Sequence, residues 1–444
     1  MHIQLTNLGS KNGAELVQAI AEVPVNVDSL DLSNNDLGFK TGAELGTALA
    51  AIKAGVTSLN LSVNFLGSRT VDELVAAFTK LPAGLTSLNL GYNLLYQKTG
   101  IDLKQIFKVL PAGLTSIDFS GEEIEGAKLA TSFIALPASV TSIHLSHNGL
   151  GRKTVAELTQ IFTAIPAGVT MLNLSMNYFD IDTLATTFSA PRAHVTSLNL
   201  RGNTYSAAPY NSVEALFKLM PASVTSLDLS SNSLCHISKK VLTNFFAALP
   251  SHIKSLNLSD NNLSFITCDV LTPFFATLPA DVTSLNLSGN YLGNKTRTEF
   301  EKTFAALSAH VTSLNLSGNR LCRKTAAELA TALAAIPASV TFVDLSKNFL
   351  DMKTEEDWIH ILSHIPGTVT YVKSDETSQE TINRILHQIR MQTLHYMAQV
   401  TPLFGDVAHL TMSFAANTPL LFWQQEAKPL TIKDPSVLNA VLLR

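Results

Sequence analysis

The segment VTSLNLSVNFLG, residues 56–67, decides the fold because it returns along the chain with few changes. It reads VDSLDLSNNDLG at residues 27–38, DVTSLNLSGNYLG at 281–293 and HVTSLNLSGNRLC at 310–322. An asparagine keeps the same place in most copies, and most steps between these asparagines are 29 residues long. The asparagines are Asn35, Asn64, Asn93, Asn148, Asn177, Asn203, Asn232, Asn261, Asn290, Asn319 and Asn348. A fixed period of this length predicts a solenoid, in which each repeat stacks on the next.

Each repeat is predicted to contain a short strand followed by a helix. The stretch SLNLS alternates polar and apolar residues, which predicts a strand with Leu59 and Leu61 facing a core. In KTAAELATALAAIP, residues 324–337, apolar residues such as Leu329 and Leu333 recur at helical spacing. Repeated strand–helix units predict parallel strands with right-handed crossovers. The fold class is therefore an α/β solenoid, a horseshoe with parallel strands on the concave face and the wider helices on the convex face.

The predicted helix starts carry a capping signal. Several repeats have threonine followed three residues later by glutamate, a spacing that lets each side chain bind a backbone N–H of the first helical turn. The pairs are Thr41 and Glu44, Thr70 and Glu73, Thr154 and Glu157, and Thr325 and Glu328, with Asn12 and Glu15 in the same arrangement. These capping boxes fix where each helix begins.

The asparagine of each repeat is expected to satisfy backbone groups at the turn after the strand, rather than to bind a ligand. Glu122 replaces it in one repeat. The steps from Glu122 to Asn148 and from Asn177 to Asn203 are each three residues short. This irregularity predicts a local kink or a shifted loop near Glu122.

Composition limits the function classes. Hydrophobic residues make up 46% of the 444 residues, enough for a long core, and a net charge of -4 argues against a nucleic-acid-binding protein. Three widely spaced cysteines, Cys235, Cys268 and Cys322, suggest neither a disulfide framework nor a zinc site. We expect no metal and no cofactor. No Sec-type signal peptide is recognised at the start, and no apolar run is long enough to insert into a membrane.

Residues 27–372 resemble the leucine-rich-repeat family, specifically its ribonuclease-inhibitor-like class with full helices. The consensus LPAxVTSLNLSxNxLGxKTxxEL resembles the repeats of Legionella-type secreted effectors. That resemblance implies a protein made in the bacterial cytoplasm and translocated by type IV secretion into a host cell, where it acts in virulence by binding a host protein. Residues 431–444, TIKDPSVLNAVLLR, offer an apolar tail without the dense acidic block of such a signal.

We therefore expect a monomeric protein–protein interaction scaffold and not an enzyme. The sequence has no HExxH, P-loop or GxSxG motif in the required context, and the strand neighbours of His144, Ser142 and Ser146, make no catalytic triad. One alternative is a general bacterial repeat protein for binding or adhesion. Another is a ubiquitin-ligase-type effector, which the absence of any cysteine beyond Cys322 disfavours.

Three parts of the chain are predicted. Residues 1–26 form a shortened repeat that caps the core, and residues 27–372 form the repeats. Residues 373–444 form a C-terminal helical cap, with a helix over 376–398 and one possible degenerate strand after Val407.

The candidate binding residues are departures from a uniform pattern. Between the buried leucines, the strand positions facing the concave surface are mostly serine, then asparagine or aspartate, then serine. Such a ladder has few of the aromatic and arginine side chains that dominate binding energy. The departures are His144, Met171, Arg201, Phe342, Tyr371 and Lys373, joined by Tyr205 and Tyr210 in the loop NTYSAAPYNS. These residues either form partner-binding patches or result from sequence drift among duplicated repeats.

A basic residue precedes the capping position in many repeats. This basic row consists of Lys40, Arg69, Lys98, Lys153, Lys295, Lys324 and Lys353. A cation beside a helix N-terminus is not favoured by the helix dipole. The row is explained either by duplication of an ancestral repeat or by a phosphate or acidic partner along this edge.

Overall fold

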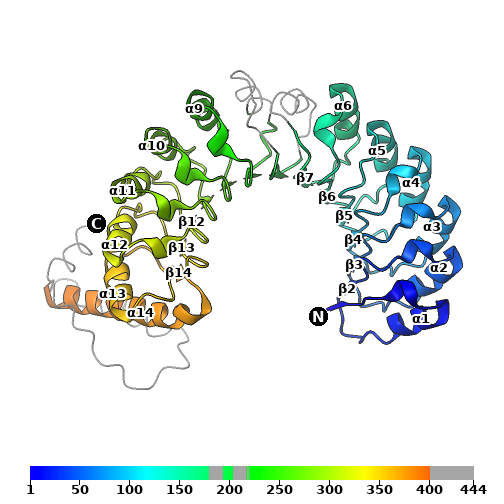
Figure 1. The fold of residues 1–444 in the computed structure, drawn as a ribbon, viewed down its shortest axis with the longest axis horizontal. Coiled ribbons are helices and arrows are strands. Elements are labelled where there is room, and N and C mark those ends of the chain that lie inside the picture. The colour runs from blue at the N-terminus through cyan, green and yellow to red at the C-terminus, as the bar shows by residue number, and fades with distance from the viewer. Residues whose placement is uncertain (180–193, 204–216, 218–219, 401–444) are drawn as a thin grey trace. The chain divides into compact units, whose positions relative to one another are not determined.

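The computed structural model describes residues 1–179, 194–203, 217 and 220–400, and for residues 376–378 and 393–400 it describes the backbone alone. The chain forms two compact units, Met1–Ile253 (unit 1) and Lys254–Arg444 (unit 2). In each unit, short parallel strands lie on one face and helices on the other (Figure 1). This arrangement confirms the α/β solenoid of parallel strands and helices that the repeat predicts.

Unit 1 contains nine described strands, which neighbour one another in chain order. They are β1 (His2–Gln4), β2 (Ser29–Asp31), β3 (Ser58–Asn60), β4 (Ser87–Asn89), β5 (Ser116–Asp118), β6 (Ser142–His144), β7 (Met171–Asn173), β8 (Ser197–Asn199) and β9 (Ser226–Asp228). Its described α-helices are α1 (Gly13–Ala21), α2 (Gly42–Ala50), α3 (Val71–Phe78), α4 (Gly100–Lys108), α5 (Gly126–Phe133), α6 (Val155–Thr163) and α9 (Lys239–Ala247).

Unit 2 repeats the pattern. Its strands are β10 (Ser255–Asn257), β11 (Ser284–Asn286), β12 (Ser313–Asn315), β13 (Phe342–Asp344) and β14 (Tyr371–Lys373). Its helices are α10 (Cys268–Ala276), α11 (Arg297–Ala305), α12 (Ala326–Ala334), α13 (Glu355–Ser363) and α14 (Glu376–Val400). The last of these covers the segment 376–398 that the sequence predicts to be helical. The predicted strand after Val407 lies outside the described residues.

The core is built from the same repeat positions in every coil. Leu59 and Leu61 are buried as predicted, and so are Leu329 and Leu333 of α12. Strand pairing keeps equivalent residues opposite each other, so that Leu285 of β11 pairs with Leu314 of β12, and so on along each unit. Stacked leucines bury apolar surface continuously, which a single repeat could not do alone.

All the capping boxes predicted from the sequence are present. At α12, the Thr325 hydroxyl accepts the Glu328 N–H, and the Glu328 carboxylate accepts the Thr325 N–H at 2.9 Å. The backbone N–H bond lowers the pKa of the Glu328 carboxyl from its ordinary value. The structure adds boxes at Thr99, Thr296 and Thr354, two of which use aspartate in place of glutamate.

The repeat asparagines form a buried ladder, as the structural interpretation predicts. The Asn319 side-chain oxygen accepts the N–H groups of Asn290 and Leu292 at 3.0 and 3.1 Å. Its amide nitrogen donates to the carbonyls of Leu287, Leu316 and Ser317 at 2.9, 2.9 and 3.3 Å. Each asparagine thus joins its own turn to the turn of the preceding repeat.

Glu122 continues this ladder with a carboxylate. Its oxygens accept the N–H groups of Asn93 and Leu95, the second at 2.5 Å. The side chain is fully buried, and burial raises the pKa of the Glu122 carboxyl to about 7. Strand pairing of β5 with β6 keeps its register, and the 3-10 turn found in neighbouring repeats is absent between β5 and α5, all of which the structure describes. The predicted irregularity is therefore a shortened loop and not a break in the strands.

Candidate functional site

On the strand face of each unit, exposed or half-buried polar side chains of successive strands lie next to one another. In most described strands the central residue is buried and its two neighbours are half-buried. The asparagines on this strand face, which differ from the buried register asparagines, bind the backbone of their own repeat. For example, the Asn315 side chain accepts the Ser317 N–H at 2.9 Å. Small polar side chains of this kind contribute little binding energy. The positions where a larger or charged residue replaces them are therefore the better candidates for contact with a partner.

The mid-chain candidates lie on adjacent strands of unit 1. His144 of β6 is within 3.2 Å of the Ser142 hydroxyl and 3.3 Å of the Asn173 amide. Met171 of β7 pairs with Ser142 in the strand register and is 44% exposed. Arg201 follows β8 and is also exposed. The structure therefore brings His144, Met171 and Arg201 onto one part of the strand face.

The remaining two mid-chain candidates, Tyr205 and Tyr210, lie outside the described residues. Their role stays a prediction.

The candidates near the C-terminal end form a compact cluster in unit 2. The rings of Phe342 and Tyr371 stack with their centroids 5.6 Å apart and their planes at 15°. The Lys373 ammonium donates to the Asp344 carboxylate at 2.9 Å. We call Phe342, Asp344, Tyr371 and Lys373 the aromatic patch. Register places these side chains together, because Phe342 pairs with Tyr371 and Asp344 with Lys373.

The ion pair of the aromatic patch is only partly shielded from water. Burial opposes ionisation of Asp344, but hydrogen bonds from Ser346 and from Lys373 outweigh it, and the pKa of Asp344 is lowered. The hydrogen bond to Asp344 raises the pKa of the Lys373 ammonium. Asp344 is buried and Lys373 is half exposed, so the patch presents a fixed cation beside two stacked rings.

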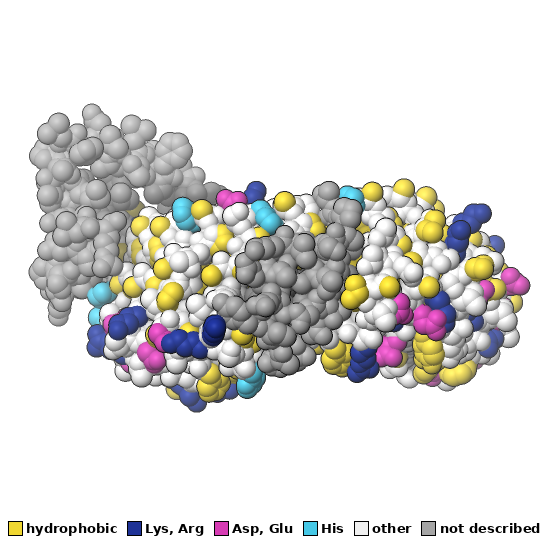
Figure 2. Space-filling view, turned by 90° about the horizontal axis from the view of Figure 1, so that it is seen from above, with side chains coloured by type: hydrophobic (Ala, Val, Ile, Leu, Met, Phe, Trp, Pro, Cys, Tyr) yellow, Lys and Arg dark blue, Asp and Glu magenta, His cyan; other side chains and the backbone are white. Residues whose placement is uncertain are grey.

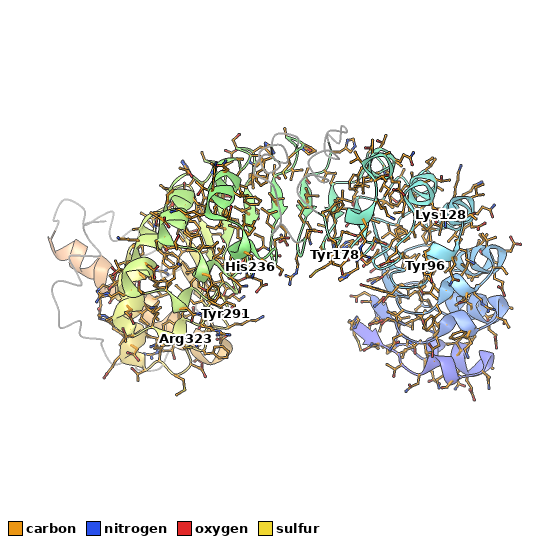
Figure 3. All side chains as sticks on the ribbon, turned by 45° about the horizontal axis from the view of Figure 1, so that its top comes forward. Tyr96, Lys128, Tyr178, His236, Tyr291 and Arg323 are labelled. Atoms are coloured by element: carbon orange, nitrogen blue, oxygen red, sulfur yellow. The ribbon has the colours of Figure 1, made fainter. Side chains whose placement is uncertain are left out.

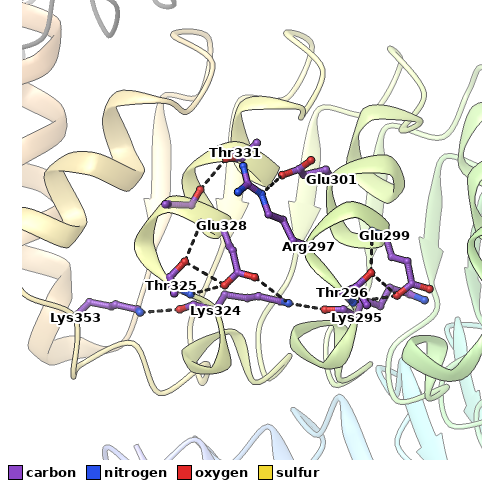
Figure 4. Close-up of polar contacts among 11 residues, drawn as sticks. Lys295, Thr296, Arg297, Glu299, Glu301, Lys324, Thr325, Glu328, Thr331 and Lys353 are labelled. Carbon is purple, nitrogen blue, oxygen red and sulfur yellow. Dashed lines mark hydrogen bonds and ion pairs between the residues drawn. The ribbon is translucent and has the colours of Figure 1, made fainter.

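Most lysines of the basic row bind the backbone of the preceding repeat. Five of its lysines donate through Nζ to carbonyls of the preceding repeat, and these carbonyls belong mainly to residues that end a 3-10 turn (Figure 4). The contacts run from Lys40 to Gly9 and Lys11, from Lys98 to Arg69, from Lys295 to Ser264 and Ile266, from Lys324 to Lys295, and from Lys353 to Lys324. The hypothesis of an anion-binding edge is wrong for Lys295 and Lys324, because both side chains are buried and their ammonium groups hold backbone oxygens. For the other members of the row it stays a prediction.

Replacing Lys324 with methionine tests this role. Lys324 is 7% exposed and its ammonium donates to the Lys295 carbonyl at 2.5 Å. Methionine keeps much of the packing but leaves that carbonyl without the charged donor, so we expect the free energy of unfolding to fall by about 1–3 kcal/mol. Urea denaturation followed by circular dichroism measures the change. Lys254→Met, at an exposed lysine, is the control and should change stability by less than about 0.5 kcal/mol. Equal effects of the two changes would contradict the structural role.

A second surface was missed from the sequence. The two variable positions of VTSLNLSxNxLG flank the register asparagine, and in most described repeats both have left-handed backbone conformation. Several large side chains stand there, among them Tyr92 and Tyr178 in unit 1 and Tyr291 and Phe349 in unit 2. Figure 3 shows Tyr178 and Tyr291 on loops that follow strands of their own units. The signal available in the sequence was that these two positions vary from repeat to repeat while the asparagine between them recurs. The sequence pattern alone did not indicate their backbone conformation.

Groups that could support other chemistry are few. Among the residues that the structure describes, no cluster of three or more histidine, cysteine, aspartate or glutamate side chains could hold a metal ion. No helix in the described ranges is long and apolar enough to cross a membrane. On the face seen in Figure 2, the described charged side chains form small groups of mixed sign rather than a large field of one sign.

Comparisons with known proteins agree with the repeat pattern. A family model described as "Leucine Rich repeat" matches residues 250–264. The crystal structure of the leucine-rich repeat-containing protein LegL7 from Legionella pneumophila is similar, with 27% identity over 87% of this chain and 97% of that one and a TM-score of 0.42. No curated protein matches the chain.

Proposed function

Because this chain is a leucine-rich-repeat protein, we propose that it is a non-enzymatic scaffold that binds another protein through its strand face. The observation that carries the proposal is the aromatic patch of unit 2. It places two stacked rings and a paired lysine on an otherwise small, polar ladder. Aromatic anchors surrounded by near-neutral polar contacts are the usual composition of a binding hot spot.

The mid-chain candidates extend the same proposal to unit 1. Met171 offers an exposed, adaptable apolar side chain, and His144 on the adjacent strand lies within hydrogen-bond distance of Ser142 and Asn173. A thioether next to oriented polar groups suits a protein surface better than a small metabolite.

The finer proposal is that the partner is a host protein and that the chain is a translocated bacterial effector acting as a monomer. Its support is the likeness of the repeat consensus to the repeats of Legionella-type secreted effectors. A translocation reporter fused to the chain tests it. Reporter signal in the host cytosol that needs a working type IV secretion system is expected, and surface display on the bacterium alone would favour an adhesion protein instead.

The double change Phe342→Ser and Tyr371→Ser tests the binding surface. Serine occupies the equivalent position in β12, where Ser313 pairs with Phe342, so the ladder accepts it without rebuilding. A partner captured from host lysate by the wild-type chain should bind the variant roughly tenfold or more weakly, because two aromatic anchors are lost. Calorimetry with the purified partner measures this.

A matched control is Ile101→Ser, which removes an apolar side chain that is 65% exposed and lies on helix α4 of unit 1. It should leave the affinity unchanged. Equal affinity of the wild type and the double variant would remove the aromatic patch from the proposal and leave His144, Met171 and Arg201 as the remaining strand-face candidates.

A further inference from the structure

The loops that follow β10 to β13 form a second surface in unit 2, on either side of the register asparagines. The position after each asparagine is occupied by Asn262, Tyr291, Arg320 and Phe349, all with φ between 56° and 58°. We call this series, with Phe265, Arg323 and Lys347 from the same loops, the loop edge of unit 2. Left-handed backbone of this kind is disfavoured for large side chains and is tolerated best by glycine and asparagine.

Turn geometry does not explain the large residues of the loop edge. Gly149 of unit 1 and Asn262 of unit 2 hold the same turn position, so small residues suit it. The neighbouring left-handed position in these loops is glycine at Gly289 and Gly318. Tyr291 and Arg320 therefore carry a conformational cost that the turn itself does not require. Local strain of this type concentrates where side chains serve binding.

The two arginines of the loop edge are held by neighbouring side chains but have no acidic partner among the described residues. The Arg320 guanidinium lies over the Tyr291 ring, 4.3 Å from its centroid, and Arg323 donates to the Asn294 side chain at 2.6 Å. Within the part of the chain that the structure describes, neither arginine nor Lys347 forms an ion pair with a carboxylate. Unlike them, Arg297, Arg384 and Lys373 each have an acidic partner.

Apolar side chains lie in the same loops. Phe265 is 71% exposed and Phe349 is 65% exposed. Two acidic residues, Asp260 and Asp351, are also exposed on these loops, and the Asp375 carboxylate reaches the same edge, where it accepts the Lys347 N–H at 2.7 Å. The edge therefore holds charges of both signs, and Arg320 and Arg323 supply its cationic part. So mixed a surface cannot neutralise the dense phosphates of a nucleic acid. It suits a segment that offers a few carboxylates between apolar side chains, since arginine binds carboxylates through paired hydrogen bonds.

We propose that the loop edge of unit 2 docks an acidic segment of a partner protein, with carboxylates bound by Arg320 and Arg323 and apolar side chains packed on Tyr291 and Phe349. The inference rests on the proposed binding function and adds to it a second surface and a class of partner. It differs from the strand-face proposal in the residues that make the contact.

Fluorescence anisotropy with a short labelled peptide of repeated Glu-Glu-Phe tests the proposal on the full chain. The peptide should bind, and its affinity should fall as salt is added. A matched peptide of repeated Lys-Lys-Phe should bind at least roughly tenfold more weakly, because the unpaired cations repel it. The double variant Tyr291→Asn and Arg320→Asn should weaken binding of the acidic peptide by roughly tenfold or more.

The same variant separates binding from folding. Asparagine already fills this position at Asn262, so the Tm of the variant should stay unchanged or rise while peptide binding is lost. A lower Tm together with unchanged binding would show that Tyr291 and Arg320 are structural and would overturn the proposal. No binding of the acidic peptide at millimolar concentration, or tighter binding of single-stranded polyuridylate, would overturn it as well.

The strand-face variant distinguishes this failure from failure of the proposed function. Phe342→Ser with Tyr371→Ser should leave acidic-peptide binding intact, because the aromatic patch lies on the strands and not on the loops. Retained peptide binding with unaltered capture of the host partner would reject the strand-face proposal alone. Lost peptide binding in this variant would reject the loop edge as the peptide site.

Discussion

Replacing Asn319 with alanine is expected to lower the free energy of unfolding by about 4 kcal/mol. The N–H groups of Asn290 and Leu292 are buried in the turn of the preceding repeat, and both donate to the Asn319 side chain. Alanine leaves both donors without an acceptor, at about 1–3 kcal/mol each. The carbonyls of Leu287 and Leu316 suffer less, because the amides of Asn290 and Asn348 also donate to them. Urea denaturation monitored by circular dichroism measures the loss.

Asn315→Ala is the matched control in the same repeat. The Asn315 side chain is half-buried on the strand face and accepts one N–H, from Ser317. Its loss should cost about 1 kcal/mol, because water can replace the amide on this face. Equal losses of unfolding free energy in the two variants would show that the buried register asparagines do not stabilise the coil more than the asparagines of the strand face do.

Replacing Glu122 with asparagine is expected to stabilise the protein at high pH and much less at low pH. The pKa of the Glu122 carboxyl is about 7 in the folded chain against 4.5 for the ordinary group. The folded chain therefore holds this proton more tightly than the unfolded chain, and the contribution of Glu122 to stability is greatest below pH 4.5. It is lost as pH rises to about 7, a change of about 3 kcal/mol. Asparagine does not titrate and is the residue used by the other repeats.

The measurement is the difference in free energy of unfolding between Glu122→Asn and the wild type at several pH values. This difference should grow by about 3 kcal/mol from pH 4.5 to pH 8. Glu123→Asn is the control, because Glu123 is exposed and its positive φ suits asparagine. A difference for Glu122→Asn that does not change with pH would show that the carboxyl titrates normally, as an exposed group does.

Part of the candidate site could be predicted from the sequence. The departures at His144, Phe342 and Tyr371 stand out because their neighbours in the ladder are serine, asparagine or aspartate. The stacking of Phe342 on Tyr371 follows from register, since the two residues are one repeat apart and their strands pair. The loop edge could not be predicted in the same way, because the left-handed turn that carries Tyr291 and Arg320 recurs along the chain but holds a different residue type in each repeat.

The basic row shows the same limit. Its spacing is plain in the sequence, yet whether the Lys324 ammonium points to solvent or to the Lys295 carbonyl depends on how closely one coil lies on the next. Glu122 is similar: its place in the asparagine series is visible, but burial and the shifted pKa come from the turns packed around it.

The sequence by itself determined the coil: the strand, the capping box, the helix and their order, because each rests on residues a few positions apart and repeats with a constant period. Only the tertiary structure decided which charged side chains are used within the fold and which remain for a partner. Lys324 is satisfied by the preceding coil while Arg320 stays exposed, although both lie in the same repeat. The physical reason is that a side chain forms a hydrogen bond only if its partner in the adjacent coil lies within hydrogen-bond distance. The spacing of residues along the sequence does not specify that distance.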